Sequence, residues 1–257
     1  MIVNTAGKIQ TSSSPNISTP ITTLLNGVGV YETLRTYHRV PFRLEEHLER
    51  LMVSARLMGI VSEWNGQTIR EQLNRTIVKQ RFGESKVRII LTPQDFIITV
   101  EQLEEKPRQY YQRGVSLVSY RGVRFIPEAK KIADTVCSLA HAYAEQEGAY
   151  DAVLVGTRGQ VSECAYANIF WVRNGVLLTT NKNILFGITR QIVIELAKGC
   201  RYAPVTSEGL LKADEVFITQ TTSGILPVHS IDGELVGTGR PGPMTKALIK
   251  QFRALTA

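Results

Sequence analysis

The sequence predicts an α+β protein with two lobes. Short runs of apolar and β-branched residues, typical of strands, dominate both halves of the 257-residue chain. Only a few stretches repeat apolar residues at the three- and four-residue spacing of an amphipathic helix. A polar stretch between the halves, residues 121–131, is typical of a connector.

The first half predicts strands arranged around two helices. Residues 1–20 are rich in Ser, Thr and Pro, which indicates an irregular entry segment that could include one short strand. Leu44 and Leu48 begin a ladder at helical spacing and Gly59 is a stop signal, so residues 43–60 predict a helix. The other elements expected here are a helix over 67–80 and strands over 28–37, 86–92, 96–103 and 114–120, with turns near His38–Val40 and at Pro93–Asp95.

The second half predicts more strands and two further helices. Residues 133–148 predict a helix that ends at Gly148, and a second helix over 188–200 follows Gly187. The strands expected in this half cover residues 150–156, 167–173, 176–180 and 215–220. No repeat of fixed period and no low-complexity tract is visible.

Composition and charge argue against several classes of protein. The chain has 43% hydrophobic and 21% charged residues, as globular proteins do, and lacks the run of about 18 apolar residues that a membrane span needs. Its 30 Lys and Arg outnumber its 23 Asp and Glu, giving a net charge of +7. No block of about five to eight basic residues accompanies this excess. A diffuse excess of this size indicates either a solvated surface or a site for small anions, and we expect neither nucleic acid nor a membrane as partner.

Cysteine content favours a reducing compartment. Cys137, Cys164 and Cys200 are too few and too scattered for a disulfide framework or a clustered metal site, so we expect no metal. No basic segment followed by an apolar stretch, the mark of a secretory signal, is visible. These features predict a cytoplasmic protein.

Two loops and one arginine are candidates for binding an anion. Gly187 precedes a predicted helix whose first residues, Ile188 and Thr189, offer N–H groups to a phosphate, although a glycine turn capped by Thr189 explains the same residues. The run TQTTSG, residues 219–224, offers further donors or is an ordinary Ser/Thr-rich turn. Arg50 lies beside the apolar ladder of its helix, where it either reaches a phosphate or is simply exposed.

Seven stretches, in order along the chain, carry a family resemblance: GVYETLRTY, PFRLEEHLERL, AKKIADTVCSLAHAYAEQEGAYDAVLV, VSECAYANIFWVRNGVLLT, ILFGITR, LLKADEVFITQTTSGILPV and GPMTKALIKQF. Together they resemble the class IV (fold type IV) pyridoxal-phosphate aminotransferases, which include branched-chain and D-amino-acid aminotransferases and aminodeoxychorismate lyase. The resemblance implies a two-lobed fold with pyridoxal 5′-phosphate in the cleft. The expected parts are a smaller N-terminal α/β lobe over 1–117, a connector over 118–121 and a larger β-rich C-terminal lobe over 122–257.

The resemblance also assigns cofactor-binding residues. Lys130 matches the catalytic lysine by its distance from EGAYDAVLV, with Lys131 as the alternative. A lysine is required at this position because only an amine can form the Schiff base and later transfer protons. Glu163 matches the acid that keeps the pyridine nitrogen protonated. The phosphate ligands match Arg50, Ile188, Thr189 and Thr221, and Leu185 matches the residue packed on the ring, although it could equally be a core leucine.

The substrate end of the site is implied in the same way. Tyr31 matches a residue that lines the pocket for the substrate carboxylate, and Thr222 and Ser223 could offer N–H groups to that carboxylate. Arg88 falls near a position where some members carry a polar recognition residue, or it is an outward-facing strand arginine.

The chain departs from the family pattern at two places. Many members have an Asn-Tyr pair soon after the lysine, whereas this chain has Ala133-Asp134-Thr135, so Thr135 or Tyr166 would have to replace the tyrosine near the phenolic oxygen of the cofactor. Many members also have an acid where this chain has Gly224.

The reaction implied is amino transfer from an amino acid to a 2-oxo acid by a ping-pong Schiff-base mechanism, carried out by a homodimer. The nearest alternative is a lyase similar to aminodeoxychorismate lyase, which releases pyruvate. Two other classes stay open: a basic nucleic-acid-binding module, whose affinity would fall steeply with salt, and a protein that binds the cofactor without catalysis.

Overall fold

The computed structural model describes residues 1–11 and 27–257, which form two compact units. Unit 1 comprises Met1–Glu104 and Glu128–Ala133, and unit 2 comprises Glu105–Pro127 and Asp134–Ala257. Of the predicted entry segment over residues 1–20, residues 12–20 lie outside the described residues, and residues 1–11 hold two short strands, β1 (Ile2–Thr5) and β2 (Lys8–Thr11), where one was expected.

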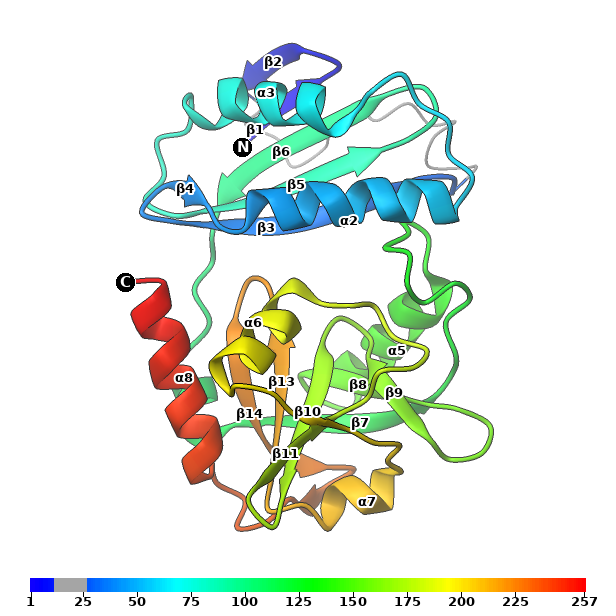
Figure 1. The fold of residues 1–257 in the computed structure, drawn as a ribbon, viewed down its shortest axis with the longest axis vertical. Coiled ribbons are helices and arrows are strands. Elements are labelled where there is room, and N and C mark those ends of the chain that lie inside the picture. Colours follow the sequence, from blue (N-terminus) through cyan, green and yellow to red (C-terminus); the bar gives the residue numbers. More distant parts are fainter. Residues whose placement is uncertain (12–26) are drawn as a thin grey trace. The chain divides into compact units, whose positions relative to one another are not determined.

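Unit 1 is a six-stranded sheet with two helices, α2 (Leu44–Leu57) and α3 (Gly66–Ile77), packed against it (Figure 1). The strand order is β2-β1-β6-β5-β3-β4, and each neighbouring pair is antiparallel. The strands are β1 Ile2–Thr5, β2 Lys8–Thr11, β3 Val30–Tyr37, β4 Val40–Pro41, β5 Ser85–Leu91 and β6 Phe96–Gln102.

Strand β3 places one charged residue among the apolar side chains that face α2. Val30 and Leu34 are fully buried in the same apolar cluster as Leu48 and Leu51 of α2. Because side chains alternate along a strand, Glu32 lies on the same face as these residues, and it is also 0% exposed. A charge buried this completely requires ionic and hydrogen-bonding partners.

The segment Glu128–Ala133 adds to unit 1 although the residues on both sides of it belong to unit 2. Tyr31 N donates to Lys130 O at 2.9 Å, and Ile132 N donates to Gly29 O at 3.1 Å. Lys131 also forms an antiparallel bridge with Val30. These contacts hold Lys130 beside the first residues of β3.

Unit 2 is built on a nine-stranded sheet, and most of its pairs are antiparallel (Figure 1). The order is β12-β11-β10-β13-β14-β7-β8-β9, with β15 paired to β14. Strand β7 runs parallel to both β14 and β8, and α5 connects it to β8. The elements are α4 Arg108–Arg113, β7 Val115–Arg121, α5 Thr135–Gln146, β8 Asp151–Val155, β9 Val161–Cys164, β10 Asn168–Arg173, β11 Val176–Thr179, α6 Ile188–Leu196, β12 Arg201–Tyr202, α7 Ser207–Leu211, β13 Glu215–Gln220, β14 Gly224–Ile231, β15 Glu234–Leu235 and α8 Pro243–Leu255.

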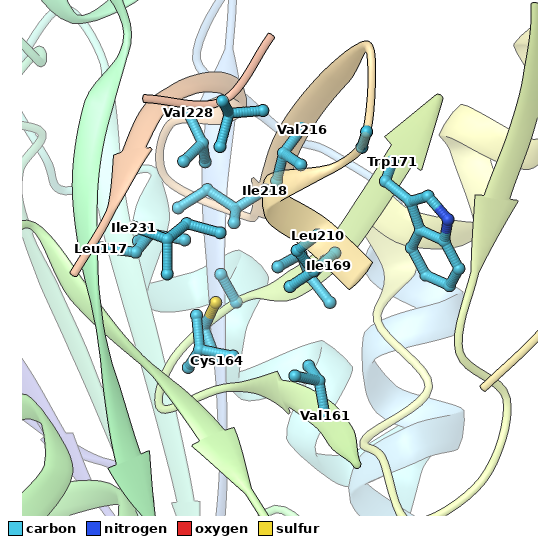
Figure 2. Close-up of a cluster of buried hydrophobic side chains, with 14 of the residues drawn as sticks. Leu117, Val161, Cys164, Ile169, Trp171, Leu210, Val216, Ile218, Val228 and Ile231 are labelled. Atoms are coloured by element: carbon cyan, nitrogen blue, oxygen red, sulfur yellow. The ribbon is translucent and has the colours of Figure 1, made fainter. Parts of the chain in front are cut away.

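The main core of unit 2 lies against this sheet, and Figure 2 shows its side chains converging. Ile169, Ile218 and Leu226 come from the neighbouring strands β10, β13 and β14 and are at most 1% exposed. Leu210 of α7 covers them and is fully buried. The sheet is therefore a rigid support for the loops that leave its strands.

The predicted α+β class is confirmed, and the predicted helices and strands all occur with bounds shifted by a few residues. The two units have different bounds from the expected lobes over 1–117 and 122–257. Strand β7 pairs within the sheet of unit 2, and residues 128–133 pair with β3 of unit 1. Among the helices of the described residues, none is long and apolar enough to cross a membrane.

Candidate functional site

A buried ion cluster lies between β3 and α2 in unit 1. The guanidinium of Arg50 donates from Nε to Glu32 Oε1 at 2.7 Å and from Nη2 to Glu32 Oε2 at 2.8 Å. His47 Nδ1 lies 2.7 Å from Glu32 Oε2. Burial alone would raise the pKa of Glu32, but Arg50 and His47 outweigh it and hold that pKa well below its usual range. Burial lowers the pKa of His47, more than Glu32 raises it.

The periodicity of helix α2 brings the residues that it contributes to this cluster onto one face. His47, Arg50 and Ser54 recur at three- and four-residue spacing, so they share one face of the helix. The side chain of Arg50 keeps 12% of its exposure, whereas Glu32 has none. Arg50 is therefore held by Glu32 on its buried side and keeps a small exposed part that an anion can reach.

The same face of α2 also contacts the segment that carries two adjacent lysines. Lys130 N donates to Ser54 Oγ at 3.1 Å, and the Lys130 amine lies 4.5 Å from the centre of the Tyr31 ring, a cation–π contact. Neighbouring side chains in an extended segment point to opposite sides. Lys131, which is only 9% exposed, therefore points away from the side on which Lys130 meets Tyr31.

A second buried carboxylate, Glu163 at the end of β9, is held by donors from three elements of unit 2. Leu185 N donates to both of its oxygens, at 3.0 and 3.1 Å, and Asn168 Nδ2 donates to Oε2 at 3.0 Å. Arg124 Nη1 donates to Oε1 at 2.7 Å. Glu163 is 3% exposed, so the charge-assisted bond from Arg124 lies in a largely dry environment.

The loop that binds Glu163 continues into the first turn of α6. Gly187 is the N-cap of this helix and no side chain caps it. A β-carbon on Gly187 would lie 2.1 Å from Asn168 Oδ1, so only glycine fits there. The first turn, with Ile188 and Thr189, therefore presents backbone N–H groups and the positive end of a helix dipole.

The loop Thr221–Ser223 joins β13 to β14 and is held in place by side-chain hydrogen bonds at Ser223. Ser223 Oγ donates to Gln220 Oε1 at 2.9 Å, and Tyr111 Oη donates to Ser223 O at 3.0 Å. Tyr150 also donates to Gln220 Oε1, at 3.0 Å, and stays protonated because burial raises its pKa to about 12. Gly224 follows with φ +70°, and a β-carbon there would approach the Phe252 ring to 3.0 Å, so any larger residue at this position is strained.

The sequence-predicted residues divide between the two units. In unit 1, Arg50 binds Glu32, the Lys130 amine contacts the Tyr31 ring, and Arg88 is exposed on the same sheet face as Tyr31, since it pairs with Thr33. In unit 2, Glu163 contacts the backbone of Leu185, two residues before Gly187. Ile188 and Thr189 lie in the first turn of α6, and Thr221, Thr222 and Ser223 form the loop between β13 and β14.

Four residues of these clusters were not identified from sequence: Glu32, His47, Arg124 and Asn168. Only Glu32 carried a readable signal, because strand alternation places its charge on the buried face. Arg124 lies in the stretch predicted as a connector, where nothing in the sequence distinguishes a buried arginine from an exposed one.

Comparisons with known proteins give one consistent result. A family model described as Amino-transferase class IV matches residues 29–231. D-alanine aminotransferase of Bacillus licheniformis is 34% identical over 242 residues, covering 86% of this chain and 84% of that protein. The crystal structure of Escherichia coli branched-chain amino acid aminotransferase matches with TM-score 0.90 and 26% identity, covering 100% of this chain and 94% of that one. A branched-chain amino acid aminotransferase of T.th. origin, solved with pyridoxamine 5′-phosphate, matches in fold, with TM-score 0.91, 24% identity and coverage of 99% and 93%.

Proposed function

This chain belongs to the class IV aminotransferase family and is a pyridoxal-phosphate-dependent aminotransferase, and from this premise we propose which of its residues carry the reaction. The enzyme moves an amino group from an amino acid to a 2-oxo acid. The relatives reported above are all named aminotransferases, which favours amino transfer over the lyase alternative.

The residues present fit the cofactor. Bound pyridoxal phosphate supplies an aldehyde that bonds to an amine and a ring that withdraws electrons from the substrate. Glu163, a buried carboxyl group bound by Arg124, is suited to hold a proton on the ring nitrogen. An uncapped helix start and an anchored guanidinium suit its phosphate. The proposed phosphate ligands are Arg50, Ile188, Thr189 and Thr221, and Leu185 is proposed to pack on the ring.

Lys130 is the proposed catalytic residue. The observation that supports it is the position of its amine over the Tyr31 ring, whereas Lys131 points to the other side of the segment. The Lys130 amine would hold the cofactor between turnovers, and as a free amine it would take the proton from the substrate α-carbon.

Substrate recognition is proposed for Tyr31, Arg88, Thr222 and Ser223. The Ser223 hydroxyl already donates to Gln220, so its backbone N–H, rather than its hydroxyl, is suited to bind the substrate carboxylate. Tyr111 fixes this loop through the Ser223 carbonyl, which keeps the N–H groups of Thr222 and Ser223 in place.

A homodimer in the cytoplasm is part of this proposal. Leu139 and Tyr143 lie four residues apart on α5 and are 54% and 38% exposed, an apolar stripe of the kind that subunit contacts cover. The free cysteines of the described residues, two of them buried, suit a reducing compartment. Light scattering of the purified protein should give twice the mass of the 28.6 kDa chain, and a monomeric mass would contradict the dimer.

The assignment of the lysine is tested with matched variants. Lys130→Ala should lose the visible absorbance of bound cofactor and all amino transfer, and borohydride should no longer fix the cofactor to the protein. Lys131→Ala should keep all three. Peptide mapping after borohydride reduction of the wild type should find the cofactor on Lys130; finding it on Lys131 would overturn the assignment.

The reaction itself is tested by mixing the holoenzyme separately with single L- and D-amino acids. Conversion to the pyridoxamine form, followed by its reversal with a 2-oxo acid, is the expected result. The relatives act, by their names, on D-alanine and on branched-chain amino acids, so both sets belong in the screen. Turnover of aminodeoxychorismate to pyruvate, with no amino transfer to any acceptor, would contradict the proposed function.

A further inference from the structure

Arg124 is a buried cation that lies between two carboxylates of unit 2. Its Nε donates to Asp134 Oδ2 at 2.8 Å and its Nη1 donates to Glu163 Oε1 at 2.7 Å. The three side chains are nearly inaccessible, with exposures of 7%, 11% and 4% for Arg124, Asp134 and Glu163. Charges removed from water in this way act on one another much more strongly than surface charges do.

Asp134 fixes where this cation lies. Its Oδ1 accepts from Cys137 N, so it is the N-cap of α5, while its Oδ2 holds Arg124. Burial by itself lowers the pKa of Arg124, and the neighbouring carboxylates raise it above its ordinary value. The guanidinium is therefore a permanent charge at a position set by the start of a helix.

Hydrogen bonding alone does not require a cation beside Glu163. Leu185 N and Asn168 Nδ2 already supply neutral donors to both of its oxygens. What Arg124 adds is a full positive charge next to the carboxylate that we propose for the ring nitrogen. Because Arg124 brings a charge as well as a hydrogen bond, it affects how strongly Glu163 stabilises a proton on another group.

We infer that Arg124 is a positioning residue that, through Glu163, sets how strongly the cofactor ring nitrogen holds its proton. The inference rests on the proposed role of Glu163. The carboxylate favours a protonated nitrogen, and the guanidinium partly neutralises that carboxylate, so the nitrogen holds its proton less strongly than Glu163 alone would allow. Asp134 in turn weakens the effect of Arg124.

Other charged or titratable groups near this cluster have separate partners or carry no charge. Cys137 is a neutral thiol, because burial raises its pKa to about 12, and burial also keeps Cys164 protonated by raising its pKa. Arg190 of α6 lies within electrostatic range of Glu163, but its Nη2 donates to Thr180 O at 2.9 Å. Arg124, by contrast, is hydrogen-bonded to Glu163 directly.

The inference predicts opposite effects for two neutralising variants. Arg124→Gln removes the positive charge, so the ring nitrogen should keep its proton to a pH about one unit higher. Asp134→Asn removes a negative charge but retains an N-cap, so the full charge of Arg124 acts on Glu163 and the shift should be about as large in the other direction. A purely structural role would move the two variants in the same direction.

The test is nitrogen-15 NMR of the holoenzyme, reconstituted with ring-labelled cofactor and titrated with acid and base. Arg121→Gln, an exposed arginine at the end of β7, is the matched control and should leave the ring-nitrogen signal unchanged. Thermal unfolding of each cofactor-free variant identifies any loss of stability separately. Arg124→Lys keeps the charge, so its signal should lie much closer to that of the wild type than the signal of Arg124→Gln does.

The outcomes separate the inference from the function on which it rests. Opposite displacements in Arg124→Gln and Asp134→Asn support the inference. Signals that move together, or that match the Arg121→Gln control, overturn it. Glu163→Gln should displace the signal toward the unprotonated nitrogen. If it does not, the proposed role of Glu163 is itself wrong. If Glu163→Gln displaces the signal while Arg124→Gln and Asp134→Asn do not, only the role assigned to Arg124 is overturned.

Discussion

The two oxygens of Glu32 are each bound by one N–H group of the Arg50 guanidinium, at 2.7 and 2.8 Å. This fork-to-fork geometry fixes the plane of the guanidinium as well as its position. An anion that binds Arg50 therefore meets a preorganised group and does not have to order a flexible side chain.

Glu32→Gln should weaken cofactor binding by about tenfold or more, because an amide cannot accept both N–H groups of Arg50 as a carboxylate does. Leaving the guanidinium without its buried counter-charge should also lower the free energy of unfolding by about 3 kcal/mol. Equilibrium dialysis of the cofactor and urea unfolding of the cofactor-free protein measure the two effects. Glu101→Gln, which disrupts only the partly exposed pair with Lys86, should change stability by less than about 0.5 kcal/mol. Equal losses in the two variants would rule out the special role of Glu32.

Acid should destabilise the wild type through the same cluster. The folded-state pKa of Glu32 lies below its ordinary value of 4.5, so its contribution is present above pH 4.5 and is lost as the pH falls toward the folded-state value. The folded-state pKa of His47 also lies below its ordinary value of 6.5, so stability is lost as the pH falls below 6.5 as well. Urea unfolding at a series of pH values should show the decline below pH 4.5 in the wild type and a flatter one in Glu32→Gln. Parallel curves would contradict this assignment.

Gly224→Ala should destabilise the protein by about 2 kcal/mol and reduce activity, because the residue has φ +70° and its β-carbon would press on the Phe252 ring at 3.0 Å. Gly159→Ala is the matched control: its φ is +77°, but a β-carbon there meets nothing within 4 Å, so it should cost only about 1 kcal/mol of backbone strain. Thermal unfolding compares the two. If Gly159→Ala is as damaging as Gly224→Ala, contact with Phe252 is not what excludes larger residues.

Glu215→Gln should loosen the C-terminal helix, α8. Glu215 is 6% exposed and accepts from Met244 N at 3.0 Å, from Thr245 N at 2.8 Å and from Thr245 Oγ1 at 2.6 Å. A neutral amide loses one acceptor and the attraction to the helix dipole, so the free energy of unfolding should fall by about 2 kcal/mol. Hydrogen exchange should rise selectively in the first turn of α8. Uniform exchange across unit 2 would instead indicate a global effect, and Glu234→Gln on the exposed strand β15 should leave exchange unchanged.

The fold was readable where one short stretch contains all of the information. Helix α2 follows from its own leucine spacing, and β5 and β6 follow from their own alternation and the turn between them. Strand β14 is not among the predicted elements; it contains Pro227, a residue type that is disfavoured inside a sheet, and this proline pairs opposite Phe217. Helix α8 was also missed, although Pro243 in its first turn and the four-residue spacing of Leu248 and Phe252 were visible signals.

The site was less readable, because its chemistry depends on pairs that are distant in sequence. Glu32 and Arg50 are 18 residues apart, and Arg124 and Glu163 are 39 residues apart. Family resemblance supplies single positions such as Arg50 and Glu163 but not the side chains that hold them. Those partners are decided by how strands and helices pack, which a linear pattern does not encode.

The segment Glu128–Ala133 makes the chain pass between the units three times, after Glu104, after Pro127 and after Ala133. The protein therefore cannot be divided into two self-sufficient fragments by one cut. A fragment of residues 1–104 would lack Lys130, and a fragment of residues 105–257 would carry Lys130 without the β3 residues that hold it. Shuffling or grafting of either unit has to transfer this six-residue insertion as well, so Lys130, the proposed catalytic residue, can be inherited only with both units.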